Sequence, residues 1–199
     1  MAERKKRYKP EARKAQIIKV TKDLIFKNGL AWASVIRISE ALGTSQATLY
    51  YHFKNRREIL LATFESVLED VGKSLLVDVE NAWDFILGSA QTLYEQTIDN
   101  PRQARLFFEF LCAPPTENMR EEVQKQLSSM VRIFEKALRR GILQGLFRDD
   151  TDVKLVAWEI LSLGLTVNIS SMLEMPDFIS MEQAMRAINS ILESIKKPA

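Results

Sequence analysis

The sequence predicts an all-α fold of about nine helices, and three observations lead to it. The chain has 7 Gly and 6 Pro among its 199 residues, well below the roughly 12% of average usage, so few positions interrupt a helix. Apolar residues recur at three- and four-residue spacing along most of the chain, which is the period of amphipathic helices. No segment shows the alternation of a strand, a low-complexity tract or an internal repeat.

The N-terminal part predicts one long helix followed by two short ones. The long helix begins near Pro10 and ends at Gly29, because Pro is tolerated in a first helical turn and Gly stops a helix. Its expected apolar face consists of Ala15, Ile18, Leu24, Ile25 and Phe26. Ser34 and Ser45 can each cap a short helix, and Gly43 separates the two.

Six more helices are expected in the remainder of the chain. They cover residues 55–79, 81–99, 101–112, 116–140, 152–173 and 180–195. Thr116 is expected to cap the helix that it opens, and Gly141 to stop that helix. Ser180 and Gln183 form a capping-box pattern before the last helix.

The charge of the chain is divided unevenly along its length. The net charge is only +2, but residues 1–60 hold 14 Lys and Arg against 5 Asp and Glu, a balance of +9. Residues 61–199 hold the other 14 Lys and Arg against 21 Asp and Glu, a balance of −7. Because Lys and Arg near a phosphate backbone release condensed counterions, the first segment favours a nucleic-acid partner.

Two short helices that meet at a glycine inside a basic segment describe a helix-turn-helix. The second short helix would lie in the major groove, where Gln46 can make paired hydrogen bonds to an adenine edge. Tyr50, Tyr51 and His52 offer polar groups to phosphates and ring faces to thymine methyls. The alternative is that the two tyrosines are ordinary half-buried surface residues. Lys54, Arg56 and Arg57 follow directly and can pair with phosphate oxygens.

The residues from Gly29 to Leu60 resemble the DNA-binding domain of the tetracycline-repressor (TetR) family of regulators. The usual run of that family appears here as Ile38-Ser39 followed by GTSQATLYYHF. Thr44 replaces the usual Val of the family, and Ala47 replaces its second Gly. Arg56 occupies the position at which the family usually has the Lys that opens the fourth helix. The resemblance covers roughly residues 10–60, and the remainder agrees with the family only in length and number of helices.

The resemblance implies a set of DNA-binding residues. Gln46, Ala47 and Tyr51 would face bases. Phosphates would be held mainly by Ser34, Arg37, Thr48, Tyr50, His52 and Lys54. The basic arm, residues 1–9, either reaches an adjacent minor groove or is a solubilising tail.

The domain boundaries expected from this reading are an arm at 1–9, a helix-turn-helix domain at 10–54 and a linking helix at 55–79. Residues 80–199 would form a helical ligand-binding and dimerisation domain. In the family, a pocket between such helices accepts a small-molecule effector. The residues expected to line it are Trp83, Phe107, Phe108, Glu109, Phe110, Met130, Phe134, Trp158 and Leu161. The alternative for each aromatic residue is ordinary core.

Glu109 lies between phenylalanines, and two roles are open to it. It pairs with Arg105 one turn earlier, or it faces the pocket and favours a cationic ligand. The apolar lining as a whole favours a hydrophobic effector, such as a fatty-acyl derivative or an aromatic compound.

The helix over residues 152–173 is apolar on opposite faces. Ile160, Leu163 and Val167 lie on one face, and Leu161, Leu165 and Met172 on another. A surface helix is apolar on one face only, so a second subunit would cover the other. With the last helix it would form a four-helix homodimer interface, which suits a palindromic operator of double-stranded DNA. The alternative is a helix buried wholly within one subunit.

Composition argues against several other classes of protein. One Cys and one His make a structural zinc site improbable, and we expect no metal and no cofactor. A catalytic triad would need His52, which the recognition helix uses, so we do not expect an enzyme. The longest uncharged run, residues 160–173, is shorter than the ~18 residues of a membrane helix, so we expect no membrane partner. The sequence therefore predicts a cytoplasmic, nucleoid-associated regulator of transcription, most simply a repressor. The alternatives are a constitutive DNA-binding protein and an enzyme with a DNA-binding module.

Overall fold

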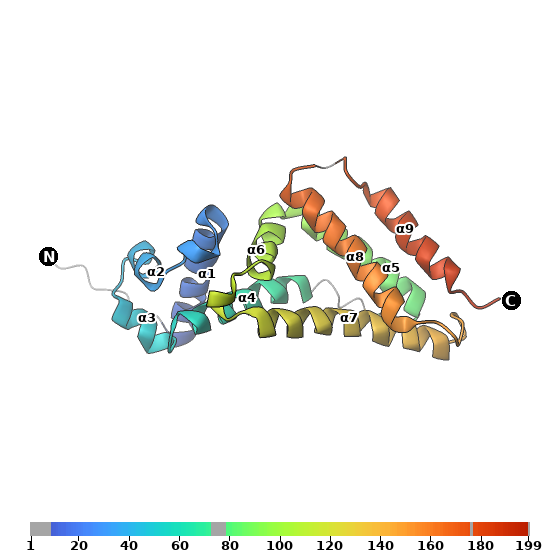
Figure 1. The fold of residues 1–199 in the computed structure, drawn as a ribbon, viewed down its shortest axis with the longest axis horizontal. Coiled ribbons are helices and arrows are strands. Elements are labelled where there is room, and N and C mark those ends of the chain that lie inside the picture. Colours follow the sequence, from blue (N-terminus) through green and yellow to red (C-terminus); the bar gives the residue numbers. More distant parts are fainter. Residues whose placement is uncertain (1–8, 73–78, 176, 199) are drawn as a thin grey trace. The chain divides into compact units, whose positions relative to one another are not determined.

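The computed structural model describes residues 9–72, 79–175 and 177–198, and its fold is all-α, as predicted (Figure 1). The α-helices of these residues are α1 (Pro10–Asn28), α2 (Val35–Ala41), α3 (Gln46–His52), α4 (Arg56–Gly72), α5 (Ala82–Asp99), α6 (Pro101–Leu111), α7 (Arg120–Leu143), α8 (Val153–Met172) and α9 (Met181–Ser194). Two short 3₁₀ helices, η1 (Leu30–Trp32) and η3 (Pro115–Glu117), lie between them. The described residues contain no strand beyond one isolated bridge between Phe147 and Lys196.

The described chain divides into two compact units. Unit 1 consists of residues 9–68 and 106–120, and unit 2 of residues 69–72, 79–105, 121–175 and 177–198. Helices α4 and α6 therefore each begin in one unit and end in the other. The segment 106–120, which is remote in sequence from the first three helices, packs in the same unit as they do.

The two serine caps of the helix-turn-helix are confirmed. The Ser34 hydroxyl accepts a hydrogen bond from the Arg37 backbone N–H at 3.3 Å, and Ser45 accepts one from Thr48 at 3.3 Å. Each cap satisfies one of the backbone donors that a helix N-terminus leaves unpaired. Gly43, with φ of +60°, forms the turn that joins α2 to α3.

The predicted apolar face of α1 is wrong in part. The buried stripe is Ile17, Thr21 and Ile25, whereas Ala15 is exposed. The Thr21 hydroxyl donates to the Ile17 carbonyl at 2.8 Å, so this polar side chain is satisfied inside the helix and can be buried. A pattern that counts only apolar residues misses such a position. The helix ends at Gly29 as predicted, with φ of +85°.

The hydrophobic core of unit 1 joins its two chain segments. Phe64 of α4 and Phe110 of α6 are both fully buried, and their ring centroids lie 4.8 Å apart. Leu106, Phe107 and Met119 are also buried in this unit. Helix α4 is described as far as Gly72, so the part of the predicted helix at residues 73–78 lies outside the described residues, and Val79 is not helical.

Helix α7 begins and ends later than predicted. Thr116 lies in η3 instead of capping α7, because Pro115 opens a 3₁₀ turn and Asn118 adopts a left-handed conformation. Gly141 does not stop the helix, which continues to Leu143; Gly145, with φ of +73°, follows its end. Gly141 is buried because the Phe147 ring packs on its backbone. It is a packing glycine and not a helix terminator.

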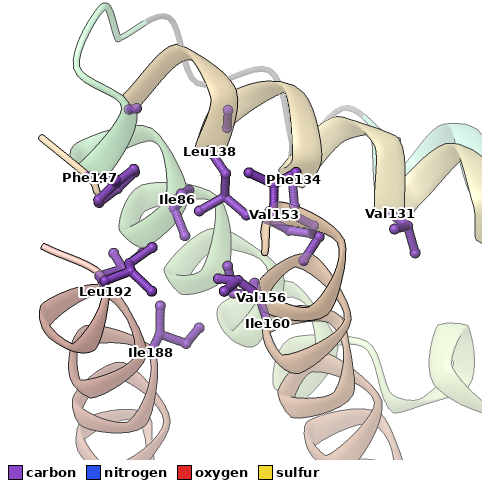
Figure 2. Packing of buried hydrophobic residues seen from close by; sticks show 14 residues of the cluster. Ile86, Val131, Phe134, Leu138, Phe147, Val153, Val156, Ile160, Ile188 and Leu192 are labelled. Carbon is purple, nitrogen blue, oxygen red and sulfur yellow. The ribbon is translucent and has the colours of Figure 1, made fainter. Parts of the chain in front are cut away.

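The core of unit 2 lies among α5, α7, α8 and α9 (Figure 2). Among the core residues that Figure 2 labels are Ile86, Phe134, Leu138, Phe147, Val153, Val156, Ile160, Ile188 and Leu192. The chain after α9 is fixed to the loop that precedes α8, since Lys197 donates to Leu146 and Arg148 donates to Ile195, both at 2.9 Å. The capping box of Ser180 and Gln183 at the start of α9 is confirmed.

Candidate nucleic-acid interface and effector domain

Helix α3 is held by its apolar side and presents its other side to solvent. Leu49 is fully buried and Phe53 nearly so, whereas Gln46, Ala47, Tyr50 and Tyr51 are exposed. Tyr51 is 80% exposed, which is extreme for a large aromatic side chain. An exposed aromatic group on a helix that is rigidly anchored by its other face is typical of a binding surface.

Helix α2 and the turn before it contribute to the same unit. The Arg37 guanidinium lies 3.1 Å from the centroid of the Trp32 ring, a cation–π contact that fixes the cation at the surface. Trp32 and Ile36 are both exposed. Trp32 was not among the predicted DNA-binding residues. Its one signal in the sequence is that a bulky aromatic residue lies within a polar helix-turn-helix.

The other predicted phosphate contacts have varied surroundings. The Thr48 hydroxyl lies 3.1 Å from the Ser45 hydroxyl, so it takes part in the cap of α3. The His52 ring is half-buried and meets the Tyr51 ring edge-on at a centroid distance of 5.0 Å. Lys54 is exposed just beyond the end of α3. All the predicted DNA-binding residues lie in unit 1, and their role on DNA stays a prediction.

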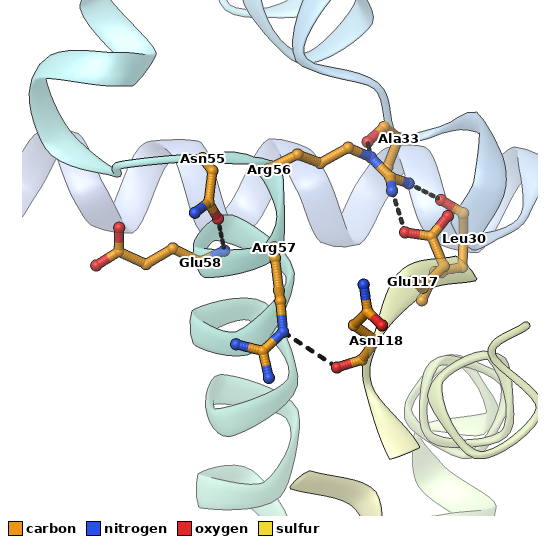
Figure 3. Close-up of polar contacts among 8 residues, drawn as sticks. All are labelled: Leu30, Ala33, Asn55, Arg56, Arg57, Glu58, Glu117 and Asn118. Atoms are coloured by element: carbon orange, nitrogen blue, oxygen red, sulfur yellow. Dashed lines mark hydrogen bonds and ion pairs between the residues drawn. The ribbon is translucent and has the colours of Figure 1, made fainter. Parts of the chain in front are cut away.

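Arg56, which the sequence reasoning offered to phosphates, is a structural residue instead (Figure 3). Its Nε donates to the Ala33 carbonyl at 2.8 Å, and its Nη2 donates to the Leu30 carbonyl at 3.0 Å. Its Nη1 pairs with the Glu117 carboxylate of η3. A guanidinium has several donors in one plane, so one side chain ties the start of α4 to the turn before α2 and to η3.

Arg57 and Glu109 make further links inside unit 1. The Arg57 Nε donates to the Asn118 carbonyl at 3.1 Å (Figure 3). The Glu109 carboxylate accepts a hydrogen bond from the Leu30 backbone N–H at 2.9 Å and lies against Gly29. The structure thus gives Glu109 a backbone partner that neither of the two expected roles included. Its partner is 79 positions away in sequence, so local spacing could not reveal the contact.

The residues predicted to bind ligand divide between the two units. Phe107, Phe108, Glu109 and Phe110 lie in unit 1, where Phe107 and Phe110 are core residues and Phe108 meets Phe107 edge-on at 6.0 Å. Those in unit 2 are Trp83, Met130, Phe134, Trp158 and Leu161. Phe134 belongs to the core of unit 2, Trp83 packs on Phe147 with centroids 5.9 Å apart, and Trp158 is 43% exposed.

Helix α8 has a buried face and an exposed apolar face. The buried face includes Val153, Val156, Ile160 and Val167. The exposed large apolar residues of α8 and its C-terminal end are Leu155, Trp158, Ile169 and Leu173, which share one side of a helix by their spacing. We call these four residues the apolar stripe. Within the described residues, α8 is also the one helix long and apolar enough to span a membrane by length and mean hydropathy (1.4), a property that core helices of other proteins share.

A comparison with known families decides what the helix-turn-helix is. The sequence model of the family described as "Bacterial regulatory proteins, tetR family" matches residues 17–63, which include α2, α3 and the start of α4. This chain belongs to the TetR family. TetR-family proteins are transcriptional regulators that bind DNA, and this one carries the family's helix-turn-helix in unit 1.

The sequence of this TetR-family chain is also similar to that of a curated relative. It is 26% identical to the fatty acid metabolism regulator protein of Bacillus subtilis over 153 residues. That alignment covers 70% of this chain and 73% of the relative.

Solved structures share the fold of this TetR-family chain along most of its length. A FadR regulator from Bacillus subtilis, in complex with stearoyl-CoA, has a TM-score of 0.70 at 21% identity and covers 90% of this chain and 95% of its own. SmeT, the repressor of a multidrug efflux pump of Stenotrophomonas maltophilia, has a TM-score of 0.76 at 20% identity and covers 96% and 93%. At these identities the similarity concerns the fold.

Proposed function

We propose that this TetR-family chain is a cytoplasmic, ligand-responsive repressor. It binds a palindromic operator on the nucleoid as a homodimer, and a hydrophobic small molecule in unit 2 releases it. The protein has no catalytic role in this account. The second candidate is a constitutive DNA-binding protein, in which unit 2 is a filled core without an effector.

The observation that carries the proposal is the exposed side of α3. Gln46, Ala47 and Tyr51 are exposed there, on a helix that Leu49 and Phe53 hold in place. A helix that presents an amide and a phenol beside surface cations can read base edges while the cations neutralise phosphates. The excess of +9 in residues 1–60 supports the same assignment.

The apolar stripe of α8 supports a homodimer. Four large apolar side chains on one side of a helix are costly to leave in water, and a matching copy of the same face would cover them. A two-fold axis makes each stripe meet its counterpart, and it also presents two α3 helices to the two halves of a palindrome.

A hydrophobic effector is supported by the relatives and by the composition of unit 2. One relative is named for fatty acid metabolism and one structural neighbour was solved with stearoyl-CoA, which favours a fatty-acyl compound here. Trp83, Met130 and Leu161 are half-buried in unit 2 and supply apolar surface of the kind that lines small-molecule sites.

The signal between ligand and DNA would travel along α4 and α6, because each of these helices belongs to both units. Arg56 and Glu117 join the start of α4 to the segment after α6 inside unit 1. A ligand that prefers one arrangement of these helices shifts the population of DNA-competent dimers, whereas equal affinity for both arrangements shifts nothing.

DNA bound to the purified protein provides the test. The protein is titrated into fluorescently labelled DNA from upstream of its own coding region, with and without palmitoyl-CoA. We expect saturable binding, weaker in higher salt, and loss of binding when the acyl compound is added. Binding that a broad panel of acyl and aromatic compounds leaves unchanged favours the constitutive candidate, and equal affinity for random DNA contradicts a specific operator.

A further inference from the structure

We propose that Arg140 of α7 and Ser89 of α5 form an anion-binding end of the ligand site in unit 2. The effector would then be an apolar molecule that carries an oxyanion head. This inference rests on the proposed function, in that it takes unit 2 to bind a hydrophobic effector, and it adds the charge and the position of the polar end.

Arg140 is a cation without an anionic partner in the part of the chain that the structure describes. Its Nε is buried and has no hydrogen-bond partner, and no carboxylate of the described residues pairs with its guanidinium. The guanidinium lies over the Phe85 ring, whose centroid is 5.3 Å from the guanidinium carbon. Partly buried cations are normally paired, because removal from water is costly without a partner. This guanidinium therefore has donors available for an anion.

Ser89 is the second group without a partner. It is fully buried, and its hydroxyl makes no hydrogen bond. The other buried polar residues that the structure describes each donate to a backbone carbonyl; they are Thr21, Ser39, Thr63, Ser170 and Ser171. A helical serine can usually donate to a carbonyl one turn earlier. Ser89 does not, so its rotamer leaves the hydroxyl free for another acceptor.

Contacts near the start of α5, together with helical spacing, place the two groups on facing parts of α5 and α7. Gln144, directly after the end of α7, accepts from the Ala82 backbone N–H at the start of α5, at 3.0 Å. Arg140 of α7 lies one turn before Gln144 and contacts Phe85, nearly one turn into α5. The two helices thus run in opposite directions here. Ser89 is one turn beyond Phe85 on the same side of α5. Helical side chains lean toward the helix N-terminus, which for Arg140 is the direction of Ser89.

This arrangement has the chemistry of an oxyanion site. A guanidinium offers two parallel N–H groups to a carboxylate or phosphate, and a serine hydroxyl adds a third donor. Phe85 beside them supplies apolar surface for the adjoining part of the ligand. The oxyanion has two possible sources, the carboxylate of a free fatty acid and a phosphate of an acyl-CoA.

Two fluorescent probes that differ by one sulfonate test the charge preference. 1-Anilinonaphthalene-8-sulfonate carries the anion, and N-phenyl-1-naphthylamine lacks it. We expect the wild-type protein to bind the sulfonate more tightly than the neutral probe. Arg140→Gln should weaken the affinity for the sulfonate about tenfold and change the affinity for the neutral probe less than about twofold. Arg139→Gln, which removes the same charge from the exposed neighbouring position, is the matched control and should change neither probe.

Two further variants separate charge recognition from a structural role. Arg140→Lys keeps the charge and should retain part of the preference for the sulfonate. Ser89→Ala should weaken the sulfonate a few-fold without lowering the melting temperature, because it removes a buried hydroxyl that has no partner in the free protein. The inference is overturned if wild type shows no preference for the sulfonate, or if Arg140→Gln weakens both probes equally.

Competition with acyl compounds separates this inference from the proposed function. Displacement of the sulfonate by palmitate or palmitoyl-CoA, but not by methyl palmitate, identifies the carboxylate or the phosphate as the head that binds. If no acyl compound displaces the probe while Arg140→Gln still weakens it selectively, the anion site stands and the fatty-acyl class of the proposed function fails.

Discussion

At the scale of residues, Gln46 and Lys54 have different expected roles on DNA. Gln46 is exposed on α3 and would read a base edge, whereas Lys54 lies just beyond the helix and would pair with a phosphate. We expect Gln46→Ala to lower discrimination between operator and random DNA by about 1–3 kcal/mol. Lys54→Ala should weaken binding to both DNAs alike and reduce the dependence on salt. Fluorescence anisotropy at several salt concentrations measures both effects.

Equal losses on operator and random DNA in both variants would contradict this division between base reader and phosphate anchor. Arg57→Ala serves as a comparison, because Arg57 is exposed nearby but donates to the Asn118 carbonyl. It should weaken binding to DNA less than Lys54→Ala does.

Gly141 lies where the packing leaves no room for a side chain. A Cβ there would overlap the Phe147 ring and lie 3.1 Å from the Cβ of Ala82. Gly141→Ala should therefore lower the free energy of unfolding by about 1–3 kcal/mol, the usual cost of overpacking. Gly164→Ala is the matched control, since a Cβ at that helical position meets nothing within 4 Å, and it should be neutral or stabilising by up to about 1 kcal/mol. Urea denaturation of both variants measures the difference, and equal stability would argue against the close packing at Gly141.

Residues whose partners are local were predictable, and those with distant partners were not. The caps at Ser34 and Ser45 bind backbone groups three residues away, so their spacing is visible in the sequence. Glu109 and Arg56 bind groups 79 and 23 to 61 positions away. Nothing in local spacing distinguishes such residues from solvent-exposed charges.

At the scale of elements, the contacts of Arg56 make the start of α4 a junction. Its side chain binds two backbone carbonyls and the Glu117 carboxylate within unit 1. We expect Arg56→Gln to lower the free energy of unfolding by about 1–3 kcal/mol, because it leaves these acceptors without a charged donor. Arg57→Gln, which gives up one hydrogen bond at an exposed site, should cost less. Chemical denaturation measures both variants, and an equal cost would show that Arg56 is not the junction.

The ends of elements were harder to predict than their existence. Helices α2, α3, α5, α6, α8 and α9 lie where their capping residues and apolar periods place them. Helix α7 begins later than predicted because a 3₁₀ turn forms at Pro115. It ends later than predicted because Phe147 packs on Gly141, which stays within the helix. In a sequence, a glycine predicts the end of a helix, but tertiary packing decides whether the helix continues past it.

At the scale of the whole molecule, the apolar stripe of α8 should control assembly. Trp158→Glu places a charge within the stripe, where a second copy would bury it. We expect the wild-type protein to be a dimer without detergent and this variant to be a monomer, as measured by size-exclusion chromatography with light scattering. Lys136→Glu reverses an exposed charge on α7 and should leave the dimer intact. A wild-type monomer, or a dimer that tolerates Trp158→Glu, would contradict the proposed interface.

The division of charge in the sequence does not coincide with the division of the fold. Residues 106–120, from the acidic part of the chain, pack in the same unit as the basic helix-turn-helix. Glu109 and Glu117 contribute their carboxylates to that unit. The candidate DNA-binding residues could be proposed from the sequence, whereas the elements that hold the helix-turn-helix in place became visible only in three dimensions.

Selection of operator DNA from a random duplex library shows whether a dimer reads DNA through α3. The purified protein is used to enrich sequences over several rounds, and the bound pool is sequenced. We expect an inverted repeat whose half-sites lie about one helical turn apart. A pool without an enriched motif, or one enriched only in a single unrepeated site, would contradict it.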